Sequence, residues 1–308
     1  MILFYYVASC KIIIGGGSME LVKQEYKFTI KFDGPDYIPV DLLCNTLVSF
    51  QALSNETPLD AKFTYNVIAH KQGSFEAEIS AIATVAPILL SPANINFVLN
   101  SLQIVKQWFE IKKHLKGEKP KSVVYEGNSA NVENMEGDIL QTTLSGASIL
   151  QNAQANTIIV AIGNTFRGFD RDALSVFSPD NGNIFKINRG DIDYISSDVN
   201  YQDQSEQDYC ETNRVLLTVI KPDIAGHSQW QFYYYRRIDA KINDAGWLDR
   251  VIDGDVFIKG KMRIDADLKS VGKKDRFGIP IEGTVKYSVE KVYGEVYNSD
   301  TTGDQTSI

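Results

Sequence analysis

Three pairs of aspartates, each with one residue between the two acids, come closest to a metal-binding pattern in this sequence. The pairs are Asp191/Asp193, Asp253/Asp255 and Asp265/Asp267. Side chains at positions i and i+2 of a strand share a face, and carboxylates are ligands that Mg²⁺ prefers. Such a site would indicate a Mg²⁺-dependent hydrolase or nuclease, with Asp265 and Asp267 as candidate ligands. Both acids alternate with apolar residues, however, which equally predicts the solvent-facing side of a half-buried strand.

An aromatic run followed by two arginines is the most distinctive local feature. It consists of Trp230, Phe232, Tyr233, Tyr234 and Tyr235, then Arg236 and Arg237. On a strand, Trp230, Phe232 and Tyr234 would share one face, and Tyr233 and Tyr235 the other. One face should be core, while rings beside guanidinium groups on the other suit nucleobases, peptides or proteins. We predict a binding surface of Trp230, Tyr233, Tyr235, Arg236 and Arg237. The alternative is a central strand covered on both sides, with Trp247 of a short helix against it.

A weaker candidate, for an anion, is the glycine-punctuated segment from Gly163 to Arg171, which contains Arg167 and Arg171. It follows a predicted helix C-terminus, where the helix dipole disfavours anions. The three histidines, His70, His114 and His227, fall on a hairpin, a helix end and a loop, and no nucleophile elbow or phosphate-binding loop is present. We therefore expect no catalytic residue and no cofactor.

The charge balance argues against duplex nucleic acid as a partner. The chain has 31 Lys and Arg against 39 Asp and Glu, a net charge of −8 and a pI near 5.0, whereas duplex-binding proteins usually present a basic face. A single-stranded nucleic acid remains an alternative, because base stacking then matters more than net charge. Cys10, Cys44 and Cys210 lack metal-site spacing, which favours a reducing, cytoplasmic compartment, with Cys44 buried on an apolar helical stripe.

The periodicity of apolar residues predicts an α+β fold with the order β-α-β-β-α-β between residues 24 and 126. Strands are predicted at Tyr26–Phe32, Phe63–Ala69, Phe75–Ala81 and Ser122–Tyr125, and helices at Pro39–Asn55 and Ser91–Gly117. This is the order of the ferredoxin-like fold, which hosts many unrelated functions. A small α/β segment should follow, with a helix from about Ser148 to Ile162 and a hairpin around Pro179–Gly182.

The chain is expected to contain two domains. An α+β domain is predicted over residues 19–195 and a mostly-β domain, a small barrel or sheet, over 213–297. Seven acidic residues and no basic one lie between Gly190 and Asn213, so 196–212 is predicted to be a solvated acidic linker. Residues 298–308 are predicted to be a flexible tail. Residues 1–18 are expected to be an untranslated leader before Met19, because Gly15–Ser18 matches a ribosome-binding site read in frame.

Three short motifs occur in the order Lys31-Phe32-Asp33-Gly34, Gly73-Ser74-Phe75 and Leu115-Lys116-Gly117. In these motifs the chain resembles a bacterial and phage family of domains of unknown function, over roughly Met19 to Tyr297. The resemblance implies a cytoplasmic bacterial or phage protein, and it implies no catalytic or binding residue.

We predict a cytoplasmic α+β protein that binds rather than catalyses. Its partner is expected to be another protein, a second copy of itself or a small ligand, contacted by the aromatic strand. No apolar run reaches the eighteen or so residues of a membrane-spanning helix, so no membrane partner is expected.

Overall fold

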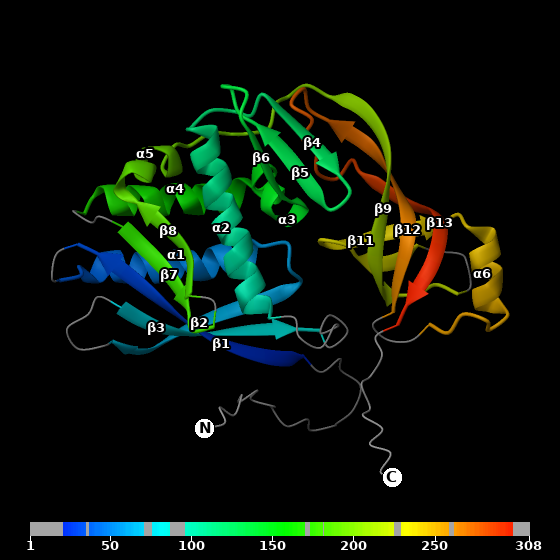
Figure 1. The fold of residues 1–308 in the computed structure, drawn as a ribbon, viewed down its shortest axis with the longest axis horizontal. Coiled ribbons are helices and arrows are strands. Elements are labelled where there is room, and N and C mark those ends of the chain that lie inside the picture. Colours follow the sequence, from blue (N-terminus) through cyan, green and yellow to red (C-terminus); the bar gives the residue numbers. More distant parts are fainter. Residues whose placement is uncertain are drawn as a thin grey trace, which may run out of the picture. The chain divides into compact units, whose positions relative to one another are not determined.

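The structure is a computed structural model in which two compact units are found. It describes residues 21–34, 37–70, 76–86, 96–169, 173–180, 182–224, 229–258 and 262–297. The first unit contains the described residues up to 86, those from 96 to 208, and 273–284; the second contains 209–272 and 285–297. The predicted leader, the predicted tail and the Gly73-Ser74-Phe75 motif lie outside the described residues. Antiparallel sheets and a barrel, together with helices, make this an α+β protein (Figure 1).

The first unit is centred on an antiparallel sheet with the strand order β2-β3-β1-β7-β8. Its strands are β1 (Val22–Asp33), β2 (Ala61–His70), β3 (Glu76–Val85), β7 (Ala173–Ser178) and β8 (Gly182–Asn188). Buried and partly exposed residues alternate along the second half of β1, which shows that one face of the sheet is covered. Phe28, Ile30 and Phe32 are buried, while Lys27 and Lys31, in the opposite phase of the strand, pair with Glu78 and Asp33.

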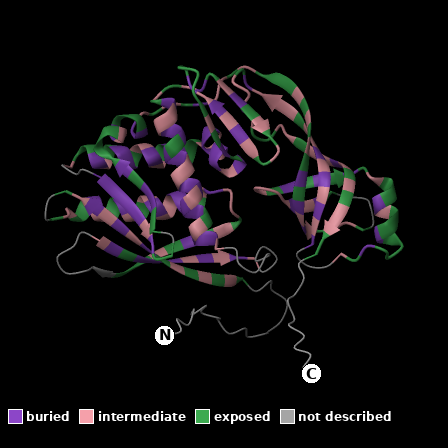
Figure 2. Ribbon diagram, viewed as in Figure 1, coloured by how far each residue is buried: buried purple, intermediate pink, exposed green. Residues whose placement is uncertain are grey.

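Helices α1 (Val40–Glu56), α2 (Phe97–Leu115) and α4 (Ala153–Arg167) pack on the apolar face of this sheet and complete the core of the first unit. Two short helices, α3 (Leu144–Ala147) and α5 (Ile192–Ile195), pack against α2, and α5 also packs against α4. The longest, α2, starts with Asn96, whose side chain accepts a hydrogen bond from the backbone of Leu99, and ends at Lys116 in the left-handed conformation. Its buried side is wide, as its two apolar stripes predict, and Figure 2 shows buried residues along it.

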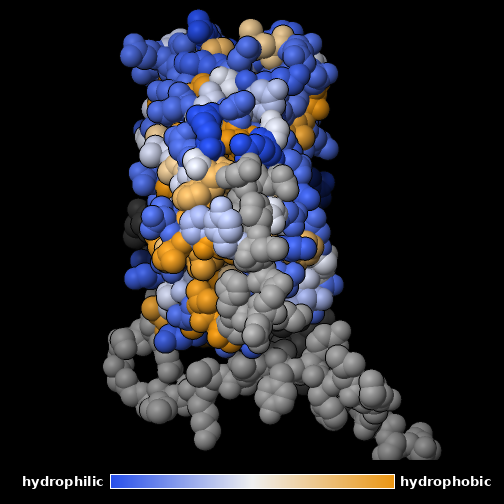
Figure 3. Space-filling model, turned by 90° about the vertical axis from the view of Figure 1, so that its left-hand side faces the viewer, coloured by the Kyte–Doolittle hydropathy of each residue, from blue (hydrophilic) through white to orange (hydrophobic). Residues whose placement is uncertain are grey.

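The prediction that Cys44 lies on the buried face of α1 is wrong. The side chains in the core are those of Leu42, Thr46, Phe50 and Leu53, among others. Val40 is 73% exposed, and Cys44, expected to be buried, is an exposed free thiol. Apolar residues lie on several sides of this helix, so periodicity alone does not fix which side faces the sheet. Figure 3 shows further exposed apolar side chains on one face of the first unit.

A separate three-stranded antiparallel sheet contains β4 (Ser122–Glu126), β5 (Ser129–Glu133) and β6 (Ile139–Thr143). The segment Ser122–Tyr125, expected as the last strand of the β-α-β-β-α-β order, therefore pairs with β5, and β7 is the strand that lies beside β1. A local reason is the two-residue turn between β4 and β5, where Gly127 has a positive φ of 55° that suits a tight hairpin.

The segment 196–212, predicted to be a solvated linker, is packed in the structure. Residues 196–208 belong to the first unit and 209–212 lie within β9 (Gln207–Lys221). Tyr201 is only 3% exposed, and the carbonyl oxygens of Ser197 and Val199 accept hydrogen bonds from side chains of α2 and α4. The acidic residues do not prevent this packing, because the segment is held by the buried ring of Tyr201 and by its backbone carbonyl groups.

The second unit is a closed barrel, one of the two architectures predicted for this region. Its strand order is β10-β11-β13-β12-β9, with β11 parallel to β13. The strands that follow β9 are β10 (Trp230–Tyr233), β11 (Arg237–Ile242), β12 (Arg263–Lys274) and β13 (Lys286–Val296), and helix α6 (Ala245–Ile252) lies between β11 and β12. Buried and exposed residues alternate along β11, which places one row inside the barrel (Figure 2).

Helix α6 closes the apolar core of the barrel. Its Trp247 ring contacts Trp230 edge-on, with 5.5 Å between ring centroids. Asp244 fixes the start of the helix, since Oδ1 accepts the N–H of Trp247 and Oδ2 accepts the N–H of Val292 on β13. The core is therefore held together by aromatic contacts and by a cap that links helix to strand.

Candidate functional site

Trp230, predicted as part of the binding surface, belongs to the barrel core. It is 2% exposed, and its ring stacks on Phe232 at 6.1 Å in addition to the contact with Trp247. Trp230 and Phe232 lie on the inward side of β10. For this face the structure matches the alternative of a covered strand with Trp247 packed against it. Trp230 is therefore a core residue of the barrel and not part of an exposed surface, as the prediction had placed it.

The aromatic strand ends earlier than its sequence predicts. β10 stops at Tyr233, and residues 234–236 form the turn to β11, closed by a hydrogen bond from the N–H of Tyr234 to the carbonyl of Arg236 at 3.0 Å. Tyr234 and Tyr235 therefore do not continue the two-face alternation. Their rings meet edge-to-face at 5.3 Å.

A guanidinium group lies among tyrosines at this turn. The Arg236 guanidinium is 5.4 Å from the centroid of the Tyr235 ring, and its Nη2 donates to the Tyr287 hydroxyl at 3.5 Å. Burial raises the pKa of Tyr234 and of Tyr235, and it raises that of Tyr209 on β9 to about 12. These phenols are neutral at physiological pH, so the cluster offers hydroxyl groups and one positive charge.

Tyr233 and Arg237 are the predicted site residues that share the outer face of the barrel. They are direct cross-strand partners on β10 and β11, and the next outward pair is Gln231 with Asp239. Tyr233 is half-buried and Arg237 is exposed. Directly opposed side chains in an antiparallel pair are close enough to act together. This pair places an aromatic ring beside a guanidinium group on one surface.

Four lysines extend this surface, and the sequence alone did not single them out. Lys221 pairs with Gln231, Lys241 continues the outward row of β11, and Lys269 pairs with Ser288, the neighbour of Lys241. Tyr287 of β13 pairs with Ala240 of β11, and the two strands are parallel. Lys286, one residue before Tyr287, therefore lies beside Asp239. We call the outward residues Lys221, Gln231, Tyr233, Arg237, Asp239, Lys241, Lys269 and Lys286 the hairpin face.

The hairpin face is more basic than the chain as a whole. Among its eight residues are five Lys or Arg and one acid, Asp239. Over residues 209–272 and 285–297 the chain has 12 Lys and Arg against 11 Asp and Glu, a net charge of +1, although the whole chain has −8. The negative charge therefore lies mainly outside the barrel. An acidic total does not exclude an anionic ligand at this face, because screening makes charge interactions local.

The aspartate pair considered for a metal is occupied by protein partners. Arg214 binds Asp265 through two hydrogen bonds of 3.0 and 2.7 Å, and this guanidinium lowers the pKa of the Asp265 carboxyl. Tyr293 donates its hydroxyl proton to Asp267 at 2.7 Å, and Arg214 lies 4.2 Å from the centroid of its ring. No group of three or more His, Cys, Asp or Glu placed to hold a metal occurs among the residues described.

The other candidate residues are engaged elsewhere. Arg167 binds Asp193 at 3.0 Å and also the hydroxyl of Ser196, so it ties α4 to α5. Arg171, its predicted partner for an anion, lies outside the described residues. A ring nitrogen of His114 lies 3.0 Å from the carbonyl of Val132. These contacts give Arg167 and His114 structural roles.

Comparisons with protein-family models, with curated proteins and with solved structures found no match. Within the described ranges, no helix combines the length and the apolarity that crossing a membrane requires. The functional conclusion therefore depends on the geometry of the hairpin face.

Proposed function

We propose that the barrel is a binding module for single-stranded nucleic acid and that the ligand crosses the hairpin face. The observation that carries this proposal is the cross-strand pair of Tyr233 and Arg237 on the outer surface of β10 and β11. A tyrosine ring offers a stacking surface to an unpaired base, and the neighbouring guanidinium can contact the adjacent phosphate.

The connectivity of the barrel supports this choice of surface. Numbered along the chain, its strands close in the order 1-2-3-5-4, the third and fifth are parallel, and the helix lies between the third and fourth. This arrangement resembles the oligonucleotide- and oligosaccharide-binding fold, whose second and third strands commonly contact the ligand. Those strands are β10 and β11 here. Because a fold does not determine a function, the side chains of the hairpin face remain the main support.

The alternatives fit the hairpin face less well. A protein partner or a second copy would favour a surface poor in lysine, since lysine is depleted in protein–protein interfaces. Here Lys221, Lys241 and Lys286 are exposed on the hairpin face. A Mg²⁺-dependent hydrolase would need free carboxylates at Asp265 and Asp267, which instead bind Arg214 and Tyr293. Single strands are favoured over a duplex, because a base must be unpaired to stack on Tyr233.

We further propose that the first unit is a ferredoxin-like scaffold with an insertion. In this interpretation β7 replaces Ser122–Tyr125 as the last strand of the unit, since β2-β3-β1-β7 keeps each strand antiparallel to its neighbours. Residues 122–172 would then be inserted between α2 and β7. A cytoplasmic setting is also part of the proposal, because Cys44 and Cys210 are exposed free thiols that a reducing compartment preserves.

Fluorescence anisotropy with labelled oligo(dT) and oligo(U) of about 15 nucleotides, near the upper site size of such barrels, tests the proposed function. We expect salt-sensitive binding by the full chain, and a loss of roughly 5- to 100-fold in affinity in Tyr233→Ala, the range for one stacked base. The matched control is Tyr293→Ala, which removes an exposed ring outside the hairpin face.

A second pair of variants tests the phosphate contacts. Lys241→Gln/Lys286→Gln should weaken binding and reduce the dependence of log affinity on log salt by about 0.7 per lysine that contacts a phosphate. Lys291→Gln, an exposed lysine of β13 beside Tyr293, is the control. The proposal fails if the wild-type chain binds neither oligonucleotide, or if Tyr233→Ala and Tyr293→Ala lose affinity equally while both remain folded.

A further inference from the structure

The connection between β12 and β13 belongs to the first unit and not to the barrel that these strands help to build. Residues 273–284 cluster with the first unit. Connections between antiparallel strands usually run over the surface and are mobile. In this connection Ile279 is fully buried and Asp275, a charged residue, is 1% exposed. Such burial of a carboxylate requires specific partners.

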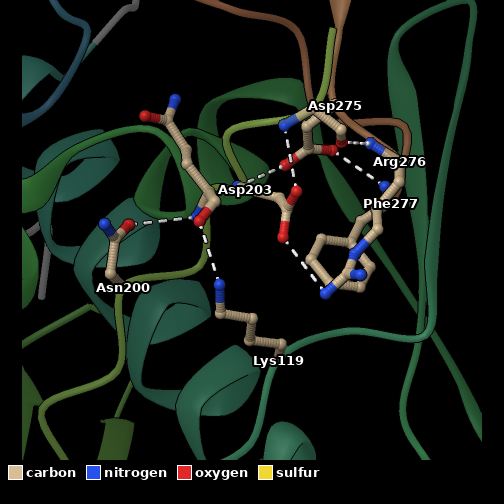
Figure 4. A network of polar contacts seen from close by, with 8 residues as sticks. Lys119, Asn200, Asp203, Asp275, Arg276 and Phe277 are labelled. Atoms are coloured by element: carbon tan, nitrogen blue, oxygen red, sulfur yellow. Dashed lines mark hydrogen bonds and ion pairs between the residues drawn. The ribbon is translucent and has the colours of Figure 1, made fainter. Parts of the chain in front are cut away.

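The partners of Asp275 are three backbone N–H groups. Oδ1 accepts from Phe277 and from Ile279, each at 2.9 Å, which fixes the shape of the turn itself. Oδ2 accepts from the N–H of Asp203 at 3.0 Å, which joins the turn to a segment far away in the sequence (Figure 4). Hydrogen bonds to an ionised acceptor are roughly twice as strong as neutral ones.

Arg276 adds a second connection between the same two segments. Its guanidinium lies 3.1 Å from the carboxylate of Asp203. The backbone N–H of Arg276 donates to the hydroxyl of Ser205 at 2.9 Å. The Phe277 ring lies between two cations, 4.8 Å from the Arg276 guanidinium and 5.7 Å from Lys119 Nζ (Figure 4). Lys119 in turn donates to the carbonyl of Gln202 at 3.0 Å. Charge, aromatic and backbone contacts thus converge on residues 275–277.

Strand β4 holds the other side of the turn. The N–H of Val123 donates to the carbonyl of Phe277 at 2.6 Å. Gly278 has a φ of +90°, and a Cβ at this position would lie 2.3 Å from the carbonyl oxygen of Val123. Only glycine allows this close approach of the two backbones. The loop therefore fits β4 directly.

The segment that Asp275 binds is itself fastened to the helices of the first unit. Lys112 Nζ donates to the carbonyl of Ser197 at 2.9 Å, and Asn156 Nδ2 donates to the carbonyl of Val199 at 3.1 Å. The buried ring of Tyr201 follows. We call residues 197–206 the strap. It leads directly into β9, so its attachment fixes where that strand begins.

We infer that the strap and the loop 273–284 form one interlocked element of the first unit, the mount, with Asp275 as its positioning residue. In the described chain, the passages between units occur at 208/209, 272/273 and 284/285, next to these segments. Because Asp275 and Arg276 bind both segments, the loop and the strap open together. This inference holds whatever the ligand of the hairpin face is.

Hydrogen exchange of the full chain, measured by mass spectrometry, tests the mount. In Asp275→Asn, Oδ1 can still accept from Phe277 and Ile279, but an NH₂ group replaces the acceptor for Asp203. We expect amide exchange to become at least about tenfold faster in both the loop 273–284 and the strap, a change that corresponds to about 1.4 kcal/mol in opening free energy. Exchange in β1 and β3 should stay as in the wild type.

Two further variants keep this test decisive. Arg276→Gln, at a position whose side chain is 60% exposed, should fold and accelerate exchange in the same two segments to a smaller extent. Arg214→Gln breaks a two-bond ion pair on the barrel wall and should leave both segments unchanged. Exchange in the loop that is equal in Arg276→Gln, Arg214→Gln and the wild type, or a change in Asp275→Asn that is confined to one of the two segments, would overturn the inference.

Discussion

The Nζ atom of Lys112 lies 2.6 Å from Oδ1 of Asn156, in the interior of the first unit, and none of the lysine is exposed. The carbonyl of Ser197 is its other acceptor, and the Tyr201 ring lies 5.8 Å away. Burial lowers the pKa of Lys112 to about 8, and the negative charge of Asp198 opposes this shift. A charged amine at this position therefore reduces stability at neutral pH while its hydrogen bonds hold the strap.

This lysine makes stability depend on pH in a defined direction. Between pH 8 and about 10.5 the unfolded chain binds more protons at Lys112 than the folded chain does, so the free energy of unfolding rises with pH, by about 3 kcal/mol over the window. Urea denaturation at pH 7.5 and 10 should show this rise in the wild type relative to Lys112→Met. Lys106→Met, on the same helix at a partly exposed position, is the control. A wild-type-minus-variant difference that is the same at both pH values would contradict the assignment.

Two helical glycines should respond to alanine in opposite directions. A Cβ at Gly163 of α4 would lie 2.8 Å from the backbone nitrogen of Ser196, whereas at Gly246 of α6 the nearest atom is 3.8 Å away. Gly246→Ala should stabilise by up to about 1 kcal/mol through helix propensity. Gly163→Ala should destabilise by about 1–3 kcal/mol, because α4 and the residues after α5 must move apart. Thermal denaturation of both variants measures this, and equal shifts would refute the close packing.

Trp230 and Tyr233, three residues apart on β10, should behave differently when truncated. Trp230→Ala removes a ring packed on Phe232 and Trp247 and should cost about 3–5 kcal/mol in unfolding free energy. Tyr233→Ala removes an outward side chain and should cost no more than about 1 kcal/mol. Chemical denaturation followed by circular dichroism separates the two outcomes. A large loss in Tyr233→Ala would mean that its ring is part of the core.

The Asp265–Arg214 pair makes a prediction about divalent metal. Because both oxygens of Asp265 are hydrogen-bonded to the guanidinium, millimolar Mg²⁺ should not raise the melting temperature of the wild type or of Asp265→Ala. Arg214 lowers the pKa of Asp265, so the contribution of the pair is present above the ordinary carboxyl pKa and is lost as the pH falls through the folded value. A Mg²⁺-dependent rise in melting temperature that Asp265→Ala abolishes would restore the metal hypothesis.

The periodicity of apolar residues was sufficient to predict a helix or strand wherever one face of that element is buried and the other is solvated. The strands predicted at Tyr26–Phe32 and Phe63–Ala69 lie within β1 and β2, because their apolar residues repeat with the period of a strand. The same reasoning failed for α1, where apolar residues on several sides left the buried face undefined. It also failed beyond Tyr233, where a turn interrupts a run of strand-forming residues.

Part of the candidate site could be predicted in the same way. The aromatic run indicated Tyr233 and Arg237. Alternation along a strand placed Tyr233 on the face opposite to Trp230 and Phe232. Lys241 could have been added from its alternation with Arg237 and Asp239. Lys221, Lys269 and Lys286 could not, because they come from other strands whose register with β10 and β11 is not written in any local pattern.

The sequence by itself determined which segments become strands and helices and which residues of an amphipathic strand point inward, because these depend on neighbours within a few positions. Tertiary structure alone decided that β7 and not Ser122–Tyr125 lies beside β1, that the acidic segment 196–208 is fastened by Lys112 and Asp275, and that lysines of neighbouring strands lie beside the outward row of β10 and β11. These outcomes depend on contacts between residues up to 148 positions apart, as in the pair Thr29 and Phe177, whose free energy exists only once the chain has folded.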